Sequence, residues 1–197
     1  MLDFFIFIRM CHIVKDFKIR NERICCLRLK ATWFSYTVIN VHAPTNEKTE
    51  ETKEEFYNLL EENVNQIARS DIKIILGDFN AKVSKESIYE PTIGNESLPD
   101  ETNTNGVKII HFVISDDLNV RSTFPHKDIH KQTWYSADSR TANQIDHVLI
   151  SNRFRSAITD RALREPDIGS DHNLLKINFE VKLRVKTGNK YNEKRKW

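Results

Sequence analysis

Residues 72–81 read Ile-Lys-Ile-Ile-Leu-Gly-Asp-Phe-Asn-Ala and give the strongest structural signal in the chain. Four of its first five residues are Ile or Leu, which predicts a strand buried on both faces of a sheet. Asp78 and Asn80 follow, and in extended backbone two such residues project from the same face. The pattern predicts a polar pair held at the rim of a buried sheet. An ordinary strand-to-loop turn, which also favours Asp and Asn, accounts for the pair equally well.

The chain of 197 residues suits one domain with a sizeable core. We assign residues 1–183 to this domain and residues 184–197 to a basic tail. Residues 182–197 hold seven Lys and Arg and only one acid, whereas the net charge of the whole chain is +2. A basic tail can contact nucleic-acid phosphates without reading base sequence, although a solvated chain end has the same composition.

The three cysteines are an odd number and two of them are adjacent, which supports neither a disulfide framework nor a zinc site. This usage favours a reducing, intracellular compartment, the nucleus or the cytoplasm. The apolar run over residues 2–8 is too short to cross a bilayer and lacks the features of a signal peptide. We therefore expect no membrane segment, and the sequence indicates no oligomeric state.

Apolar periodicity predicts the other elements. Phe56, Leu60 and Val64 share one face of a helix over residues 52–69, with Thr52 and Glu55 at capping-box spacing. A second, short helix is expected over residues 107–114. Strands are expected over residues 4–8, 24–29, 33–41, 118–124, 132–136, 145–150 and, from the alternation of its apolar residues, 175–183. Many short strands with few helices predict an α+β sandwich with sheets inside and helices outside.

Three strand ends carry groups that suit phosphodiester chemistry. Besides Asp78 with Asn80, they are Asp146 and the pair Asp171-His172. Mg²⁺ takes oxygen ligands and keeps several waters, so one or two carboxylates suffice to bind it. An imidazole beside a carboxylate can serve as a base or as a donor to a phosphate. A second carboxylate, such as that of Asp146, would fix the imidazole's tautomer and favour its charged form.

Three motifs occur in a characteristic order: GDFN at 77–80, NQIDHVLI at 143–150 and SDH at 170–172. They resemble the C-terminal motifs of the endonuclease/exonuclease/phosphatase superfamily. Within it, the likeness is greatest to the endonuclease domain of non-LTR, LINE-like retrotransposons and to the craniofacial-development-protein-like group. The likeness extends over roughly residues 15–183, and it is the three motifs together that make it specific.

The resemblance implies a four-layered α/β sandwich of two mixed, mainly antiparallel sheets flanked by helices. It also implies hydrolysis of DNA phosphodiesters with Mg²⁺ or Mn²⁺ as the cofactor, through contacts to the phosphate backbone. The residues that match positions of the family fall into three groups: catalytic Asp78, Asn80, Asp146 and His172; metal-binding Asp171; and substrate-binding His42, Thr133, Asn143 and Ser170.

Each catalytic residue inherits a role from the resemblance. Asp78 would position or activate the attacking water, and Asn80 would hydrogen-bond the scissile phosphate. His172, held by Asp146, would be either the base or a phosphate contact. His42 stands where many members have a phosphate-contacting Tyr, and a strand-end histidine satisfied by a neighbour is equally compatible with its position.

The sequence departs from the family pattern at its start. The first two strands of the family carry an Asn and a metal-binding Glu, and no early residue of this chain matches either. We therefore expect a sandwich that lacks its first strands, and weak or absent nuclease activity. A catalytically inactive remnant or a nucleic-acid-binding module is the main alternative. An inositol-phosphate or sphingolipid substrate is disfavoured, because nothing resembles the lipid-facing insertions of those branches.

Overall fold

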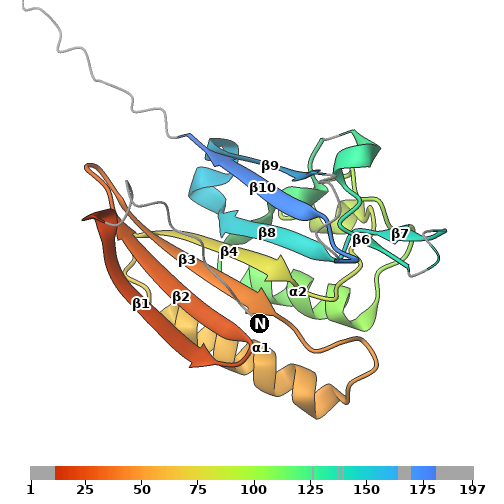
Figure 1. Cartoon of the computed structure of the whole chain (residues 1–197), viewed down its shortest axis with the longest axis horizontal. Coiled ribbons are helices and arrows are strands. Elements are labelled where there is room, and N and C mark those ends of the chain that lie inside the picture. Colours follow the sequence, from red (N-terminus) through yellow and green to blue (C-terminus); the bar gives the residue numbers. More distant parts are fainter. Residues whose placement is uncertain (1–11, 126, 137, 139, 164–169, 181–197) are drawn as a thin grey trace, which may run out of the picture.

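The computed structural model describes residues 12–180, except residues 126, 137, 139 and 164–169 (Figure 1). Its main sheet has six strands in the order β1-β2-β3-β4-β8-β5. Their bounds are Val14–Asn21, Ile24–Lys30, Ser35–His42, Ile72–Asp78, Asp146–Ser151 and Leu118–Val120, respectively. Two smaller sheets pair β9 (Ile158–Leu163) with β10 (Leu174–Phe179) and β6 (Trp134–Tyr135) with β7 (Ala142–Asn143). The α-helices are α1 (Glu50–Asn65) and α2 (Thr104–Ser115).

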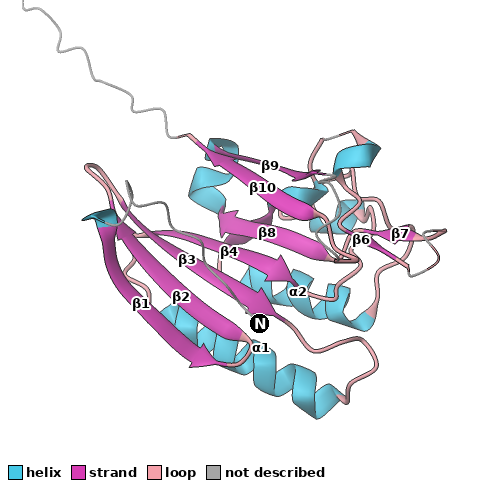
Figure 2. Ribbon diagram, viewed as in Figure 1, coloured by secondary structure: helices cyan, strands magenta, loops and turns pink. Residues whose placement is uncertain are grey.

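The main sheet is covered on opposite faces by the two helices and by the β9–β10 pair (Figures 1 and 2). Ile75 of β4 packs with helix residues such as Leu60, whereas Ile72 and Ile74 pack with the β9–β10 layer. These three isoleucines are at most 6% exposed, and burying each such side chain contributes about 1.5–3 kcal/mol. The prediction that residues 72–76 form a strand buried on both faces is confirmed.

The predicted α+β class, a large mixed sheet with a few helices, is confirmed as well. The main sheet is mixed, because β3 runs parallel to β4 while the other neighbouring pairs are antiparallel. Residues 12–180, with the gaps given above, form three layers: the two helices, the main sheet and the β9–β10 pair.

Both predicted helices are present, but their starts differ from the prediction. Helix α1 begins at Glu50 because Thr49, not Thr52, is its N-cap: the backbone N–H of Thr52 donates to Thr49 Oγ1 at 3.4 Å. It ends at Asn65, short of the predicted residue 69. Helix α2 begins at Thr104, before the predicted residue 107, because Asn103 Oδ1 accepts the N–H of Gly106 at 2.8 Å.

Most predicted strands are found at the expected positions, but several are shorter than predicted. The predicted hairpin forms between β2 and β3. Strand β5 ends at Val120 because the chain turns into a 3₁₀ helix over Arg121–Thr123, and β6 has only two residues. Sequence reasoning missed β1 and β9, where polar side chains hide the alternation. The predicted strand at 4–8, the last residues of the predicted strand 175–183 and the basic tail lie outside the described residues.

Two sequence-level expectations about environment can be compared with the described residues. Neither α1 nor α2, nor any other helix in this part of the chain, has the length and apolar character that a membrane crossing needs. Cys25 and Cys26 are both free thiols, and Cys25 is buried.

Candidate active site

The site is built on a row of paired residues that crosses three strands. At the end of β4, Asp78 is paired in register with His42 of β3 on one side and with Asp146 of β8 on the other. Neighbouring strands lie about 4.8 Å apart, so residues paired across them present side chains on the same face. His42 Nε2 lies 3.7 Å from Asp78 Oδ2. The row therefore brings one imidazole and two carboxylates together at one edge of the sheet.

Gly77 allows β3 and β4 to come this close. A Cβ at this position would lie 2.1 Å from the carbonyl oxygen of Val41, and the φ of +135° is one that L side chains rarely adopt. A side chain at position 77 would push β4 away from β3. The glycine of the GDFN motif thus fixes the position of the adjacent Asp78.

Asn80 adopts a different backbone from the one expected. Its φ is +49°, a left-handed conformation that Asn tolerates better than most residues, so the extended arrangement expected from the sequence is wrong. The turn brings its side chain back to Asp78: Nδ2 donates to Asp78 Oδ2 at 3.2 Å and to the carbonyl of Ala43 at 3.0 Å. Its backbone N–H donates to Asp78 Oδ1 at 2.8 Å. Asp78 is thereby held by two donors from one residue.

His172 reaches the row from the loop before β10. Its Nδ1 lies 3.0 Å from Asp146 Oδ2, which is hydrogen-bonding distance. The Asp146 side chain is 13% exposed and that of His172 30%, so the pair is largely shielded from water but still accessible. With Nδ1 bonded to the carboxylate, Nε2 is left as the ring nitrogen for exchange with a substrate or water.

The β6 strand docks this loop against the sheet. His172 forms a bridge with Trp134, and the backbone N–H of Tyr135 donates to the carbonyl of Asp171 at 2.9 Å. The indole N–H of Trp134 donates to Asp171 Oδ2 at 2.7 Å. Ser170 Oγ accepts the backbone N–H of His172 at 3.1 Å, which shapes the turn. Trp134, within the predicted strand 132–136, thus contacts an acidic residue of the site through its side chain.

Two residues expected to bind substrate occupy other surroundings. Thr133 is only 2% exposed, and its Oγ1 accepts the backbone N–H groups of Ile145 and Asp146 at 3.0 and 3.1 Å. Thr133 therefore holds the backbone of Asp146 in position rather than lining the site. Asn143 of β7 contributes its carbonyl to the N–H of Thr133, and it lines a neighbouring pocket of about 530 Å³ together with Lys82 and Asn103.

Sequence reasoning missed the residues that support the GDFN turn. Asn103 Nδ2 donates to the carbonyl of Asn80 at 3.1 Å, and buried Asn105 donates to the carbonyl of Pro44 at 2.9 Å. On the other side, buried His147 places Nε2 at 2.8 Å from the carbonyl of Ala81 and Nδ1 at 2.7 Å from Ser122 Oγ. An Asn immediately before an apolar helix is a capping signal that could have identified Asn103.

The surroundings of the site shift the pKa values of its titratable groups in different directions. Burial, followed by repulsion from the Asp146 carboxylate, raises the pKa of Asp78 to about 6. The hydrogen bond with Asp146 raises the pKa of His172. Burial and then the nearby Arg23 guanidinium lower the pKa of His42. The two imidazoles are therefore shifted in opposite directions: burial favours the neutral form of His42, and Asp146 favours the charged form of His172.

Whether these residues suit a divalent cation can be judged from their donor atoms and charge. The carboxylates of Asp146 and Asp171 both help to raise the pKa of Asp78, so negative charge is in excess where these groups converge. Among the described residues, no three His, Cys, Asp or Glu side chains are close enough together to hold a metal directly. Mg²⁺ needs only one or two carboxylates and fills its other positions with water. The donor set fits a hydrated hard cation, with the Asp171 carboxylate, which the resemblance implies as metal-binding, as its candidate ligand.

The sequence profile of the endonuclease/exonuclease/phosphatase family matches residues 4–172. The chain belongs to this family. Two relatives with this likeness are craniofacial development protein 2 of Bos taurus, 32% identical over 169 residues, and that of Tragulus javanicus, 33% identical over the same length. The match covers 85% of this chain but only 28% and 29% of the two relatives.

Solved structures of the same fold agree with this assignment. The endonuclease domain of TRAS1, a telomere-specific non-LTR retrotransposon, superposes with a TM-score of 0.57 at 16% identity, over 84% of this chain and 68% of that domain. An AP endonuclease from Leishmania major also gives 0.57, at 11% identity, over 81% of this chain and 55% of that enzyme. At these identities the likeness shows the fold alone, which is of the nuclease and phosphodiesterase type.

Proposed function

We propose that this family member is a divalent-metal-dependent phosphodiester hydrolase of endonuclease type that acts on DNA. The observation that carries the proposal is the 3.0 Å contact of His172 with Asp146 beside the Asp78–Asn80 pair. Hydrolysis of a phosphodiester requires a base that activates water, hydrogen-bond donors to the phosphate, and neutralisation of its charge. Asp78 can act as the base and His172 as a donor, and both lie at the same edge of the main sheet.

The residues divide this work according to their protonation. Asp78, with a pKa of about 6, is mostly ionised at neutral pH yet basic enough to accept a proton from a water molecule. His172, whose charged form Asp146 stabilises, donates from Nε2 to a phosphate oxygen. The Asn80 carboxamide keeps the Asp78 carboxylate oriented. A bound Mg²⁺ or Mn²⁺ would supply Lewis-acid neutralisation of the phosphate charge.

Support for DNA as the substrate comes from the family and from two solved neighbours that are, by name, an AP endonuclease and the endonuclease domain of a telomere-specific non-LTR retrotransposon. The same likeness supports a retroelement origin. The craniofacial development protein relatives are more than three times as long as the matched segment, so their activity as whole proteins is not transferred to this chain.

Plasmid nicking in Mg²⁺ or Mn²⁺ tests the proposal. We expect the wild-type chain to convert supercoiled DNA to nicked circles, and Asp78→Ala and His172→Ala each to reduce the rate by about 10²-fold or more, a loss typical of removing one group that stabilises a transition state. His111→Ala, which removes an exposed imidazole on α2, is the matched control and should nick at the wild-type rate. Equal background nicking by all four proteins would contradict the proposal.

One observation favours a second function, a nucleic-acid-binding module without catalysis. The described residues do not bring three side-chain ligands together for a metal, an arrangement that a module without catalysis would tolerate. Such a module would bind DNA equally well after Asp78→Ala or His172→Ala and would lose affinity when residues 184–197 are deleted. Binding measured by fluorescence anisotropy in the same buffers separates it from the enzyme.

A further inference from the structure

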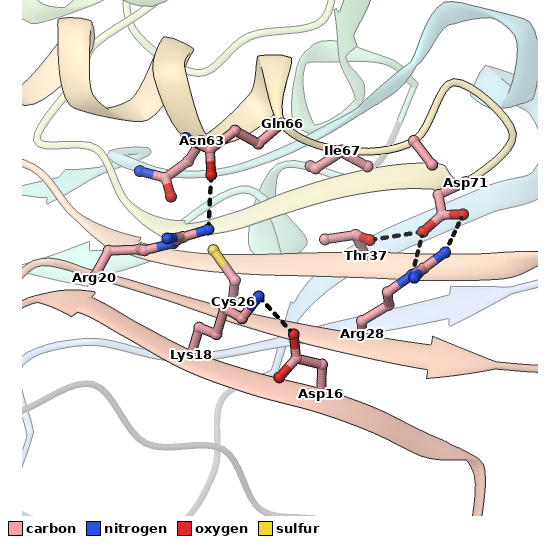
Figure 3. Close-up of a pocket in the computed structure, with 11 residues that line it drawn as sticks. Asp16, Lys18, Arg20, Cys26, Arg28, Thr37, Asn63, Gln66, Ile67 and Asp71 are labelled. Atoms are coloured by element: carbon pink, nitrogen blue, oxygen red, sulfur yellow. Dashed lines mark hydrogen bonds and ion pairs between the residues drawn. The ribbon is translucent and has the colours of Figure 1, made fainter.

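A polar pocket of about 200 Å³ lies between strands β1 and β2 of the main sheet and the end of α1. Figure 3 shows side chains from β1 and β2 on one side and those at the end of α1 on the other. Asp16, Lys18 and Arg20 alternate along β1 and so share one face, opposite Cys26 and Arg28 of the paired β2 strand. None of the residues of the candidate active site lines this pocket.

Arg20 carries the unbalanced charge of the pocket. The Arg28 guanidinium is neutralised by Asp71, which it contacts at 2.7 and 3.1 Å, and Lys18 is neutralised by Asp16 at 2.8 Å. Arg20 instead donates to the neutral Gln66 Oε1 at 3.0 Å, and its charge partly offsets the rise that burial causes in the pKa of the Cys26 thiol. Within the described part of the chain, no carboxylate forms an ion pair with Arg20. The lining therefore has one net positive charge.

Besides the positive charge of Arg20, the pocket contains a hydrogen-bond acceptor without a donor, on Asn63. Its side chain enters the pocket from α1 and the residue is only 4% exposed. Its Nδ2 donates to the carbonyl of Leu59 at 2.7 Å, which fixes the orientation of the carboxamide. Among the described residues, Oδ1 is buried with no hydrogen-bond partner. A buried unpaired acceptor costs about 1–3 kcal/mol, so a ligand that donates a hydrogen there is favoured.

We propose that this pocket binds hydrogen phosphate, the small anion that meets both requirements. Its charged oxygens accept hydrogen bonds from Arg20, and the P–OH group that it retains at neutral pH donates to Asn63 Oδ1. Sulfate has the same size and charge but no hydrogen to donate. The volume is below that of pockets for drug-sized ligands, which limits the occupant to a small molecule.

Amide chemical shifts recorded during titration with inorganic phosphate at pH 7.5, without divalent metal and at constant ionic strength, test this site. We expect saturable shifts at Arg20, Cys26, Asn63 and Gln66, and at least several-fold weaker binding of sulfate. Shifts confined to the Asp78 and His172 region, or equal affinity for the two anions, would overturn the proposal.

Three variants sharpen the assignment. Arg20→Gln should weaken phosphate binding about tenfold or more, because a hydrogen bond to a charged group is lost. Asn63→Leu, which keeps the branching at Cγ but has no polar atom, should abolish the preference for phosphate over sulfate. Arg155→Gln, which removes an exposed guanidinium of another region, should change neither affinity. Unchanged phosphate affinity in Arg20→Gln, or a preference that persists in Asn63→Leu, would refute the site.

Discussion

Replacing Asp78 with Asn should make the protein more stable at neutral pH while it removes the proposed base. The pKa of this carboxyl rises from an ordinary value of 3.8 to about 6 in the folded protein, because the group is buried and lies near Asp146. The difference is about 2, and each pKa step corresponds to about 1.4 kcal/mol, so the ionised carboxylate costs the folded state about 3 kcal/mol at pH 7.

The sign of the effect follows from proton binding. The folded state binds the Asp78 proton more tightly than the unfolded state, so this group's stabilising contribution is complete below about pH 3.8 and is lost as the pH rises through about 6. Asp78→Asn removes this dependence. The variant keeps an acceptor for the Asn80 backbone N–H, which is 2.8 Å from Asp78 Oδ1, but an amide nitrogen replaces Oδ2 and loses the hydrogen bond from Asn80 Nδ2, at a cost of about 1 kcal/mol. We expect a net gain in the free energy of unfolding of about 2 kcal/mol at pH 7, or roughly 4–8 °C in Tm.

Urea denaturation of both proteins in EDTA, at pH 7 and at pH 4, measures the effect. The difference between the two proteins isolates Asp78 from the other titrating groups, and it should shrink towards zero at pH 4. Asp146→Asn is the matched control, since its carboxylate is paired with His172 and its loss should destabilise the protein. An Asp78→Asn variant that is no more stable than the wild type at pH 7 would refute the reasoning.

Three further outcomes are expected. Leu60→Ala, at a fully buried position of α1, should lower the free energy of unfolding in urea by about 2–5 kcal/mol. Asn103→Ala should cost about 1 kcal/mol as a lost cap and should also slow DNA nicking, because Asn103 supports the carbonyl of Asn80. Burial lowers the pKa of His147, so its contribution to stability is present above the ordinary value of 6.5 and is lost on acidification below it; a His147→Leu variant should show a weaker loss in acid unfolding.

The central strand and the convergence of the motifs could be predicted, because both follow from strong local signals. Ile72, Ile74 and Ile75 form an apolar run that only a doubly covered strand satisfies. Asp78 and Asp146 each adjoin such a run, and antiparallel pairing of β4 with β8 places them opposite each other. The family resemblance explains the order of the motifs along the chain. The register between β4 and β8 explains why two of them lie next to each other.

The supporting contacts could not be predicted, because they depend on long-range packing. The left-handed turn at Asn80 is stabilised by donors from Asn103 and by the carbonyl of Ala43, which are remote in sequence. Similarly, nothing in the polar stretch around Trp134 indicates that its indole N–H would bond Asp171. Strand β1 escaped notice because it lies at the edge of the sheet and exposes most of its side chains.

The row formed by His42, Asp78 and Asp146 lies within hydrogen-bonded strands, whereas His172 arrives on a separate segment held by contacts with Trp134. The position of the imidazole relative to the two carboxylates therefore depends on how residues 170–173 dock against β6, and not on the register of the main sheet. Removing or replacing those contacts would separate His172 from Asp146 while leaving Asp78 and Asp146 paired in register.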